Sequence, residues 1–186
     1  MGNIVISEFI TLDGVIEDPG GAEGSPRGGW TSTGDGGIQF KFAELMASDA
    51  QLLGRVTYEG FAQAWPTMEG TGEFGEKMNA MPKFVVSSTL DVADWNNTTI
   101  LSGDLGEEVG ELKERYAGDI LVAGSGQLAT ALLALGLVDE LRLMVFPVIL
   151  GIGKRLFTDG PEAIRLDLAE TQKLGSVAVL TLRRKA

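Results

Sequence analysis

Two short glycine-bearing segments carry residue types that bind phosphate groups. In Gly54–Thr57, Gly54 permits a tight turn and Arg55 can pair with a phosphate through two hydrogen bonds. In Gly124–Leu128, two glycines separated by one residue let the backbone approach a pyrophosphate closely. Each segment follows an apolar run and precedes a helical pattern, which predicts phosphate contacts at a helix N-terminus. An ordinary strand-to-helix loop is the alternative for each. The candidate cofactor-binding residues of these segments are Gly54, Arg55, Thr57, Gly124, Ser125, Gly126, Gln127 and Leu128.

Hydroxyl and carboxyl groups follow two other apolar runs. Ser87 and Ser88 end the run 83–88 and could hydrogen-bond a ribose, a phosphate or a base. A cap on the end of a strand is the alternative for this pair of serines. Asp13 follows the first apolar run and is our candidate for the carboxylate that supplies a proton in catalysis. A turn stabilised by Asp13 together with Gly14 is the alternative.

Three aromatic residues, Trp30, Phe42 and Trp65, could form the wall of an apolar substrate pocket. Aromatic side chains also pack in protein cores, so a purely structural role is the alternative for each of them. Trp30 belongs to the Gly-rich segment 18–37, which is the one long irregular stretch of the sequence. A loop of that length in a compact domain is either functional or a surface linker.

Strands and helices must position these residues, and the spacing of apolar residues predicts that the two alternate along the chain. Strands are predicted over residues 4–10, 50–53, 83–88, 98–101, 120–123, 141–150, 165–171 and 178–182. Helices are predicted over 38–48, from Gly54 to Pro66, from the N-cap Asp104 to Tyr116, and over 125–135. The alternation predicts one α/β domain over residues 1–186, built on a mainly parallel central sheet. The strands near the C-terminus predict antiparallel closure of that sheet.

The composition narrows the chemistry that these residues can perform. The 186 residues include no Cys and no His, which excludes disulfides, Ser-His-Asp triads and zinc sites built from those ligands. We therefore expect no metal site, and catalysis must depend on carboxylates, hydroxyls, backbone dipoles or a bound cofactor. A net charge of −11 disfavours nucleic acid and anionic membranes as partners. The N-terminus lacks the features of a signal peptide and no apolar run reaches the roughly 18 residues of a membrane span, so we expect a cytoplasmic protein.

Six short motifs in register give the chain a resemblance to a known family. The motifs are Thr11–Gly14, Gly54–Thr57, Val86–Ser88, Gly124–Leu128, Leu137–Leu141 and Pro147–Lys154. In this order they resemble the dihydrofolate reductase-like fold, and within it the reductase (C-terminal) domain of the bifunctional riboflavin-pathway deaminase–reductase and its stand-alone bacterial relatives. The resemblance implies a sheet with helices on both faces and an antiparallel C-terminal hairpin. It also implies NADPH as the cofactor.

Roles for individual residues follow from the resemblance. It implies that Arg55 and Thr57 contact the adenosine 2′-phosphate or the pyrophosphate. Ser87 and Ser88 would flank the adenine ribose, and Gly124–Leu128 would cradle the pyrophosphate. A cation such as Arg55 agrees with a preference for the phosphorylated nucleotide, because NAD-selective sites favour an acidic residue.

At the other end of the cofactor, the resemblance places Phe9 and Ile16 beside the nicotinamide. Family members with two glycines in the second segment join them by a cis peptide bond, which predicts a cis bond between Gly124 and Ser125. The resemblance also implies a homodimer that acts on a small-molecule substrate.

The chain departs from the family at positions that choose the substrate. Dihydrofolate reductases have a carboxylate where Ile38 stands and a supporting threonine where Met144 stands. Riboflavin-pathway reductases have a Glu where Ala123 stands and an Asp near Phe61. These differences leave the substrate unassigned.

The leading interpretation is an NADPH-dependent oxidoreductase that transfers hydride to a small heterocyclic or carbonyl substrate. It resembles 5-amino-6-(5-phosphoribosylamino)uracil reductase and dihydrofolate reductase. A non-catalytic dimer that binds NADPH or a flavin is one alternative, and the missing family carboxylates favour it. A Rossmann dehydrogenase, which would prefer NAD and tolerate Arg55→Ala, is another.

Overall fold

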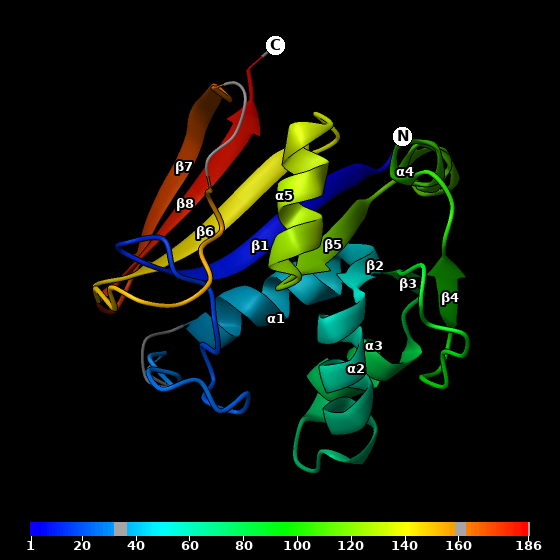
Figure 1. Cartoon of the computed structure of the whole chain (residues 1–186), viewed down its shortest axis with the longest axis horizontal. Coiled ribbons are helices and arrows are strands. Elements are labelled where there is room, and N and C mark those ends of the chain that lie inside the picture. The colour runs from blue at the N-terminus through cyan, green and yellow to red at the C-terminus, as the bar shows by residue number, and fades with distance from the viewer. Residues whose placement is uncertain (32–36, 159–162, 186) are drawn as a thin grey trace.

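The structure of the protein is a computed structural model that describes residues 1–31, 37–158 and 163–185. Among these residues, eight strands form one sheet in the order β4-β3-β2-β5-β1-β6-β8-β7 (Figure 1). The strands are β1 (Asn3–Thr11), β2 (Ser48–Gly54), β3 (Lys83–Val86), β4 (Thr98–Leu101), β5 (Asp119–Ala123), β6 (Glu140–Phe146), β7 (Leu166–Leu174) and β8 (Val177–Arg184). Neighbouring strands from β4 to β6 are parallel, whereas β8 runs antiparallel to both β6 and β7. The predicted mainly parallel α/β sheet with an antiparallel C-terminal hairpin is therefore confirmed.

Helices cover both faces of the sheet, as predicted. They are α1 (Gly37–Ala47), α2 (Arg55–Ala64), α3 (Gly72–Ala80), α4 (Leu105–Arg115) and α5 (Gly126–Ala134), with a short 3-10 helix, η1 (Trp65–Thr67), after α2. Successive residues of β1 point to opposite faces. Ile4 packs in one apolar cluster with Val109 of α4 and Leu132 of α5. Its neighbour Val5 packs in a second cluster with Leu45 of α1, to which α2 and α3 also contribute.

The crevice that matters for ligands lies between β2 and β5. These strands are neighbours, but the helices that follow them, α2 and α5, pack on opposite faces of the sheet. The last residue pair that β2 and β5 share is Gln51–Leu121, so both strands continue beyond their pairing. Where the helices after two neighbouring parallel strands pack on opposite faces, a crevice opens at the carboxyl ends of the strands, and open α/β sheets bind ligands there.

Two elements differ from the sequence prediction. The periodicity predicts no helix over residues 72–80, where α3 lies. Gly72 and Gly75 fall within its nine residues and weaken the helical signal. β6 ends at Phe146 instead of continuing to residue 150, because Pro147 has no N–H to donate to a strand ladder.

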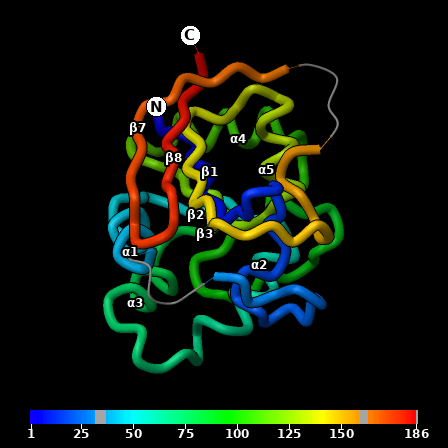
Figure 2. Tube along the Cα trace, turned by 90° about the vertical axis from the view of Figure 1, so that its left-hand side faces the viewer, coloured from blue at the N-terminus to red at the C-terminus, as the bar shows by residue number. Residues whose placement is uncertain are grey.

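The two views of the chain agree on how the ends of the sheet are arranged. β7 and β8 lie side by side at one edge, and α2 and α3 lie at the end of the molecule opposite the N-terminus (Figures 1 and 2). None of the helices in the described part of the chain combines the length and the apolar character that a membrane crossing needs.

Candidate active site

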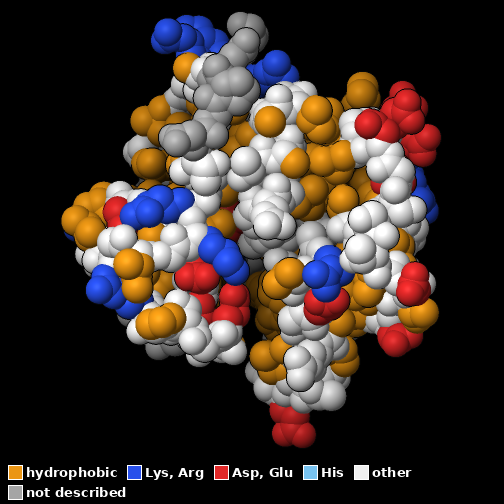
Figure 3. Space-filling model, viewed as in Figure 1, with side chains coloured by type: hydrophobic (Ala, Val, Ile, Leu, Met, Phe, Trp, Pro, Cys, Tyr) orange, Lys and Arg blue, Asp and Glu red, His pale blue; other side chains and the backbone are white. Residues whose placement is uncertain are grey.

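A cavity of about 1950 Å³ opens at the carboxyl ends of β2 and β5, where α2 and α5 begin. Figure 3 shows the molecule hollowed on this face, with hydrophobic side chains inside the hollow and charged side chains at its rim. Common small-molecule sites measure roughly 300–1,000 Å³. The cavity therefore has room for more than one small molecule.

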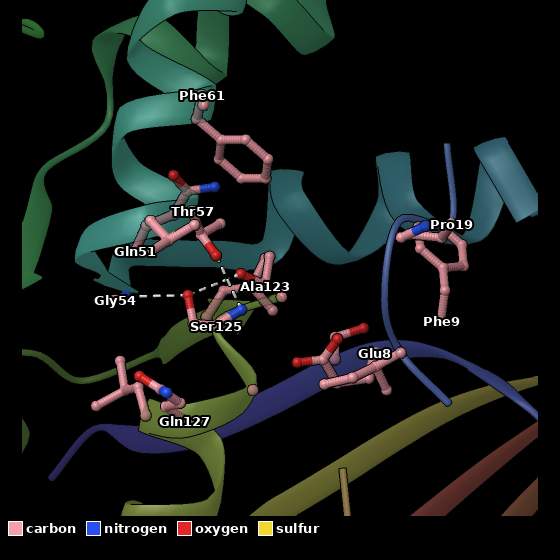
Figure 4. A pocket seen from close by; sticks show the side chains of 18 of the residues that line it. Glu8, Phe9, Pro19, Gln51, Gly54, Thr57, Phe61, Ala123, Ser125 and Gln127 are labelled. Atoms are coloured by element: carbon pink, nitrogen blue, oxygen red, sulfur yellow. Dashed lines mark hydrogen bonds between the residues drawn. The ribbon is translucent and has the colours of Figure 1, made fainter. Parts of the chain in front are cut away.

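Two hydrogen bonds join the two glycine-bearing segments in the wall of this cavity, and a third fixes the Ser125 hydroxyl locally (Figure 4). The backbone N–H of Gly54 donates to Ser125 Oγ at 2.9 Å, and the backbone N–H of Ser125 donates to Thr57 Oγ1 at 3.0 Å. Ser125 Oγ donates in turn to the carbonyl oxygen of Ala123 at 3.3 Å. The start of α2 and the start of α5 are thereby held next to each other.

Both of these helix N-termini offer backbone donors to the cavity. Neither α2, with N-cap Gly54, nor α5, with N-cap Ser125, has a side-chain hydrogen bond at its N-cap in the described structure. The Ser125 hydroxyl is used instead in the link to Gly54. Uncapped N–H groups and the helix dipole together favour an anion such as a phosphate. The donor set at this point therefore fits a ligand that carries phosphates.

The predicted cis bond between Gly124 and Ser125 is wrong, because the described residues contain no cis peptide bond. Gly124 and Ser125 instead adopt left-handed conformations, with φ of 59° and 63°. Two consecutive residues of this kind turn the chain from β5 into α5, so a trans bond suffices. Glycine takes this conformation without strain, whereas Ser125 is held in it by its hydrogen bonds to Gly54 and Thr57.

The residues that the sequence predicts for cofactor binding all line this one cavity. They are Ile16, Gly54, Arg55, Thr57, Ser87, Ser88, Gly124, Ser125, Gly126, Gln127 and Leu128. Arg55 begins α2 and forms an exposed ion pair with Glu59 at 2.9 Å. Ser87 Oγ accepts the backbone N–H groups of Thr89 and Leu90, which is the strand-end cap that the sequence left as an alternative. Ser88 is exposed at the cavity.

The three aromatic candidates for a substrate wall separate in the structure. Trp65 lines the cavity, whereas Trp30 and Phe42 are absent from its lining in the described chain. Trp30 packs edge-on against Phe146 with ring centroids 5.4 Å apart, and Phe42 lies 6.4 Å from Phe74. Phe146 and Phe74 do line the cavity, so Trp30 and Phe42 support the wall from behind.

Asp13 is held in a turn and does not line the cavity in the described structure. Its carboxylate accepts the Thr11 hydroxyl at 2.7 Å and the backbone N–H groups of Leu150 and Gly151 at 3.1 and 2.8 Å. The hydrogen bonds from Thr11 and Gly151 hold the pKa of this carboxyl well below its usual range. An anion so firmly paired is a poor proton donor, and the geometry favours the turn role.

Glu8 is the most buried of the four acidic residues that line the cavity in the described structure, and the sequence predicted a role for none of the four. It lies on β1, is 4% exposed and lines the cavity. Burial raises the pKa of Glu8 to about 8; the attraction of Lys41 opposes this shift, and the negative charge of Glu44 adds to it. Within the sequence, the only signal was one charged residue inside a run predicted to be a buried strand, where charges are rare.

Comparisons with known proteins agree with this architecture. Residues 3–180 match the family described as the RibD C-terminal domain. The uncharacterized protein YyaP of Bacillus subtilis (strain 168) is 32% identical over 183 residues, which cover 95% of this chain and 91% of that protein.

Two solved structures share the fold. RibD of Acinetobacter baumannii has a TM-score of 0.73 at 19% identity, with 100% of this chain and 59% of that chain covered. Dihydrofolate reductase from Enterococcus faecalis, complexed with NADP(H), has a TM-score of 0.60 at 17% identity, with 99% and 97% covered. The match over almost the whole chain, on a sheet of the order described above, means that this protein belongs to the RibD C-terminal domain family and has the dihydrofolate reductase-like fold.

Proposed function

We propose that the protein is an NADPH-dependent reductase that acts on a small heterocyclic or carbonyl substrate, with residues 1–186 forming a single reductase domain. The observation that carries the proposal is one continuous cavity with two different ends. Uncapped helix N-termini, Arg55 and Ser88 border one part of it, and Phe9 and Glu8 border another. A dinucleotide has the same division, with phosphates at its centre and an apolar reactive ring at one end.

The chain's own residues suit the parts of this cofactor. The N-terminus of α5, at Gly126 and Gln127, would bind the pyrophosphate through backbone N–H groups. Arg55, at the start of α2, would pair with the 2′-phosphate, and Ser88 would hydrogen-bond the adenine ribose. Membership of a reductase-type family and the NADP(H) held by the similar dihydrofolate reductase support this assignment.

Ile16 also lines the cavity and lies against the start of α5, where a Cβ atom added to Gly126 would stand 2.3 Å from Ile16 Cδ1. A larger residue at position 126 would require the Ile16 side chain to move. Ile16 and Phe9 would thus orient the nicotinamide at the floor of the cavity. When bound, NADPH would supply a hydride; the protein's part is to orient the ring and exclude water.

The alternative function is a dimer that binds a nucleotide without catalysing a reaction. Its support is that this chain lacks the carboxylates that related reductases have in their sites. Glu8 weakens that support, because it places a different carboxyl group in the same cavity as Phe9 and Ile16. A Rossmann dehydrogenase is excluded by the family to which the chain belongs.

The binding of the cofactor is tested with Arg55→Ala, measured by calorimetry with NADPH and with NADH. We expect NADPH to bind the variant roughly 10- to 100-fold more weakly, because a charge-assisted hydrogen bond contributes about 1.5–3 kcal/mol. NADH, which has no 2′-phosphate, should lose little affinity. Arg183→Ala is the matched control, since Arg183 also forms an exposed ion pair with a glutamate, Glu140, but lies outside the cavity.

Two outcomes would contradict the proposal. One is wild-type protein that neither releases heat with NADPH nor gains thermal stability from it. The other is an equal loss of affinity for both nucleotides in Arg55→Ala, which would remove the 2′-phosphate contact.

A further inference from the structure

Four acidic residues of the described chain line the cavity, and the proposed cofactor contacts use none of them; Glu8 is the most buried of the four. We propose that Glu8 is the proton donor of the reduction, and that the substrate is a neutral, flat molecule whose C=N or C=O group meets the Glu8 carboxyl group. This inference rests on the proposed function, and it adds the source of the proton and the class of substrate.

The sheet topology explains why Glu8 reaches the cavity. The pairing of β1 with β5 ends at Ser7 and Ala123, and Glu8 is the next residue of β1. On its other side Glu8 stays paired with β6, opposite Leu143, so its backbone is fixed while the β5 side is open. Figure 4 shows the Glu8 side chain projecting from β1 into the space that Ser125 also borders.

The Glu8 carboxyl group has an unused hydrogen-bonding atom. Oε1 is buried and has no hydrogen-bond partner in the described structure. A buried polar atom left unpaired costs free energy, so its presence in a fold calls for a ligand or a function. The other three acidic residues of the lining differ from Glu8: Glu44 pairs with Lys41 at 3.2 Å, Glu17 pairs with Lys154 at 3.6 Å, and Glu23 is exposed to solvent. A bound substrate would supply the partner that Glu8 lacks.

The charged side chains around Glu8 are already paired with one another. Lys41 of α1 donates to Glu44 on the same helix and to the Ser7 hydroxyl. Arg142 of β6 binds the other oxygen of Glu44 at 3.3 Å. Neither cation donates a hydrogen bond to Glu8 in the described structure, and burial outweighs the attraction of Lys41, so the pKa of Glu8 is raised. A raised pKa favours the protonated form at neutral pH, which a general acid requires.

Apolar walls limit the class of substrate. Phe9, Met144 and Phe146 line the same cavity, and the rings of Phe9 and Phe146 stand edge to face with centroids 5.8 Å apart. Walls of this kind accept a flat ring, and a charged group placed against them would lose its hydration. Lys41, whose ammonium group lies 4.9 Å from the centre of the Phe9 ring, is already paired with Glu44. A neutral carboxylic acid also pairs best with a neutral nitrogen or oxygen atom. The site therefore fits a neutral ring whose reducible bond is C=N or C=O.

In the proposed step, the heteroatom of the C=N or C=O bond would take the proton of Glu8, while its carbon would take the hydride that bound NADPH would supply. The double bond would become an amine or an alcohol, with NADP⁺ as the oxidised product. Glu8 is left as a carboxylate, and a water molecule at the cavity mouth returns its proton before the next turnover.

The test compares wild type with Glu8→Gln and Glu8→Asp on three probes and NADPH. Nitrobenzaldehyde and a dihydropteridine need a proton on the heteroatom, whereas menadione yields a hydroquinone anion that forms without a donor. We expect Glu8→Gln to slow the first two reactions about 100-fold or more relative to menadione reduction. Glu8→Asp should recover part of the lost rate. The wild-type rate should fall above a pH of about 8, with no such fall in Glu8→Gln.

A second measurement does not depend on turnover. The infrared band of a protonated carboxyl group should be present in wild type at neutral pH and absent from Glu8→Gln. Three results would overturn the proton-donor role of Glu8 in a wild-type protein that binds NADPH. They are the absence of this band, no reduction of either protonation-dependent probe, and equal rates for wild type and Glu8→Gln. The proposed cofactor site would stand in each case. If wild type does not bind NADPH, the proposed function itself fails, and the role of Glu8 in it fails too.

Discussion

At the scale of single residues, the titration of Glu8 makes the stability of the folded protein depend on pH. Its pKa is about 8 in the folded protein and near 4.5 in an unfolded chain, so between these values the folded state binds one more proton. The stabilisation from this proton is complete below the unfolded pKa and is lost as the pH rises through the folded pKa. Raising the pH from about 6 to about 9 therefore lowers the free energy of unfolding by about 2–3 kcal/mol through this one group.

Glu8→Gln removes this titration and keeps the shape of the protonated side chain. We expect urea unfolding of wild type to weaken by about 2–3 kcal/mol more than that of the variant over the same pH range. Parallel stability curves for the two proteins would show that Glu8 does not change its charge there.

The contrast between Glu8 and Asp13 shows which residue roles a sequence reveals. Asp13 stands next to Gly14 in a visible turn motif, and the structure gives it local partners such as Thr11. The role of Glu8 depends on the burial that distant segments impose and on Lys41 and Glu44, more than thirty positions away. Local spacing predicts the first kind of contact, whereas only the packed sheet reveals the second.

At the scale of elements, the strand-to-helix junctions were predictable because their signals are local. Gly54 and Gly124 follow apolar strands, and parallel strands bring their carboxyl ends to one edge of the sheet. The hydrogen bonds between Gly54, Ser125 and Thr57 then depend on β2 and β5 being neighbours, which no single segment of sequence states. Helix α3 escaped prediction because tertiary packing stabilises a segment with weak intrinsic preference.

Lys83, the first residue of β3, explains part of that packing. It is 0% exposed, and its ammonium group donates to the carbonyl oxygens of Met78, Asn79 and Met81 at 2.9, 3.1 and 2.8 Å. These carbonyls end α3, and the same ammonium group lies 4.3 Å from the centre of the Trp95 ring. A buried lysine thus caps the helix C-terminus, where a cation is favourable.

We therefore expect Lys83→Met to destabilise the protein by roughly 2–4 kcal/mol, since each buried carbonyl left unpaired costs about 1–3 kcal/mol and relaxation recovers some of that. The free energy of unfolding in urea measures the effect. Lys173→Met, at an exposed position of β7, is the matched control and should change it little. Equal effects at both positions would contradict the capping role of Lys83.

At the scale of the whole molecule, a net charge of −11 opposes the approach of a polyanion such as NADPH. The cavity lining mixes both signs of charge, with Arg55, Lys154 and Arg155 beside Glu17, Glu23 and Glu44, and the two uncapped helix N-termini add backbone donors to it. The composition alone disfavours partners such as nucleic acid, but it could not reveal these donors in the cavity. The fold brings them together from α2, α5 and the segment after β6.

The edge of the sheet leads to the last prediction, that the protein forms a homodimer. β7 is the outermost strand at one edge, and its Leu168 is 59% exposed opposite Leu182 of β8. Phe157 and Ile164, in the segment that leads to β7, are also exposed, at 51% and 54%. Exposed apolar side chains on an edge strand favour association with a second copy.

We expect sedimentation to give a dimer for wild type and a monomer for Leu168→Asp at micromolar concentration. Val92→Asp is the control, because Val92 is 65% exposed in the segment between β3 and β4, at the other edge of the sheet. A wild-type monomer, or a dimer that Leu168→Asp leaves intact, would show that this edge does not join two copies.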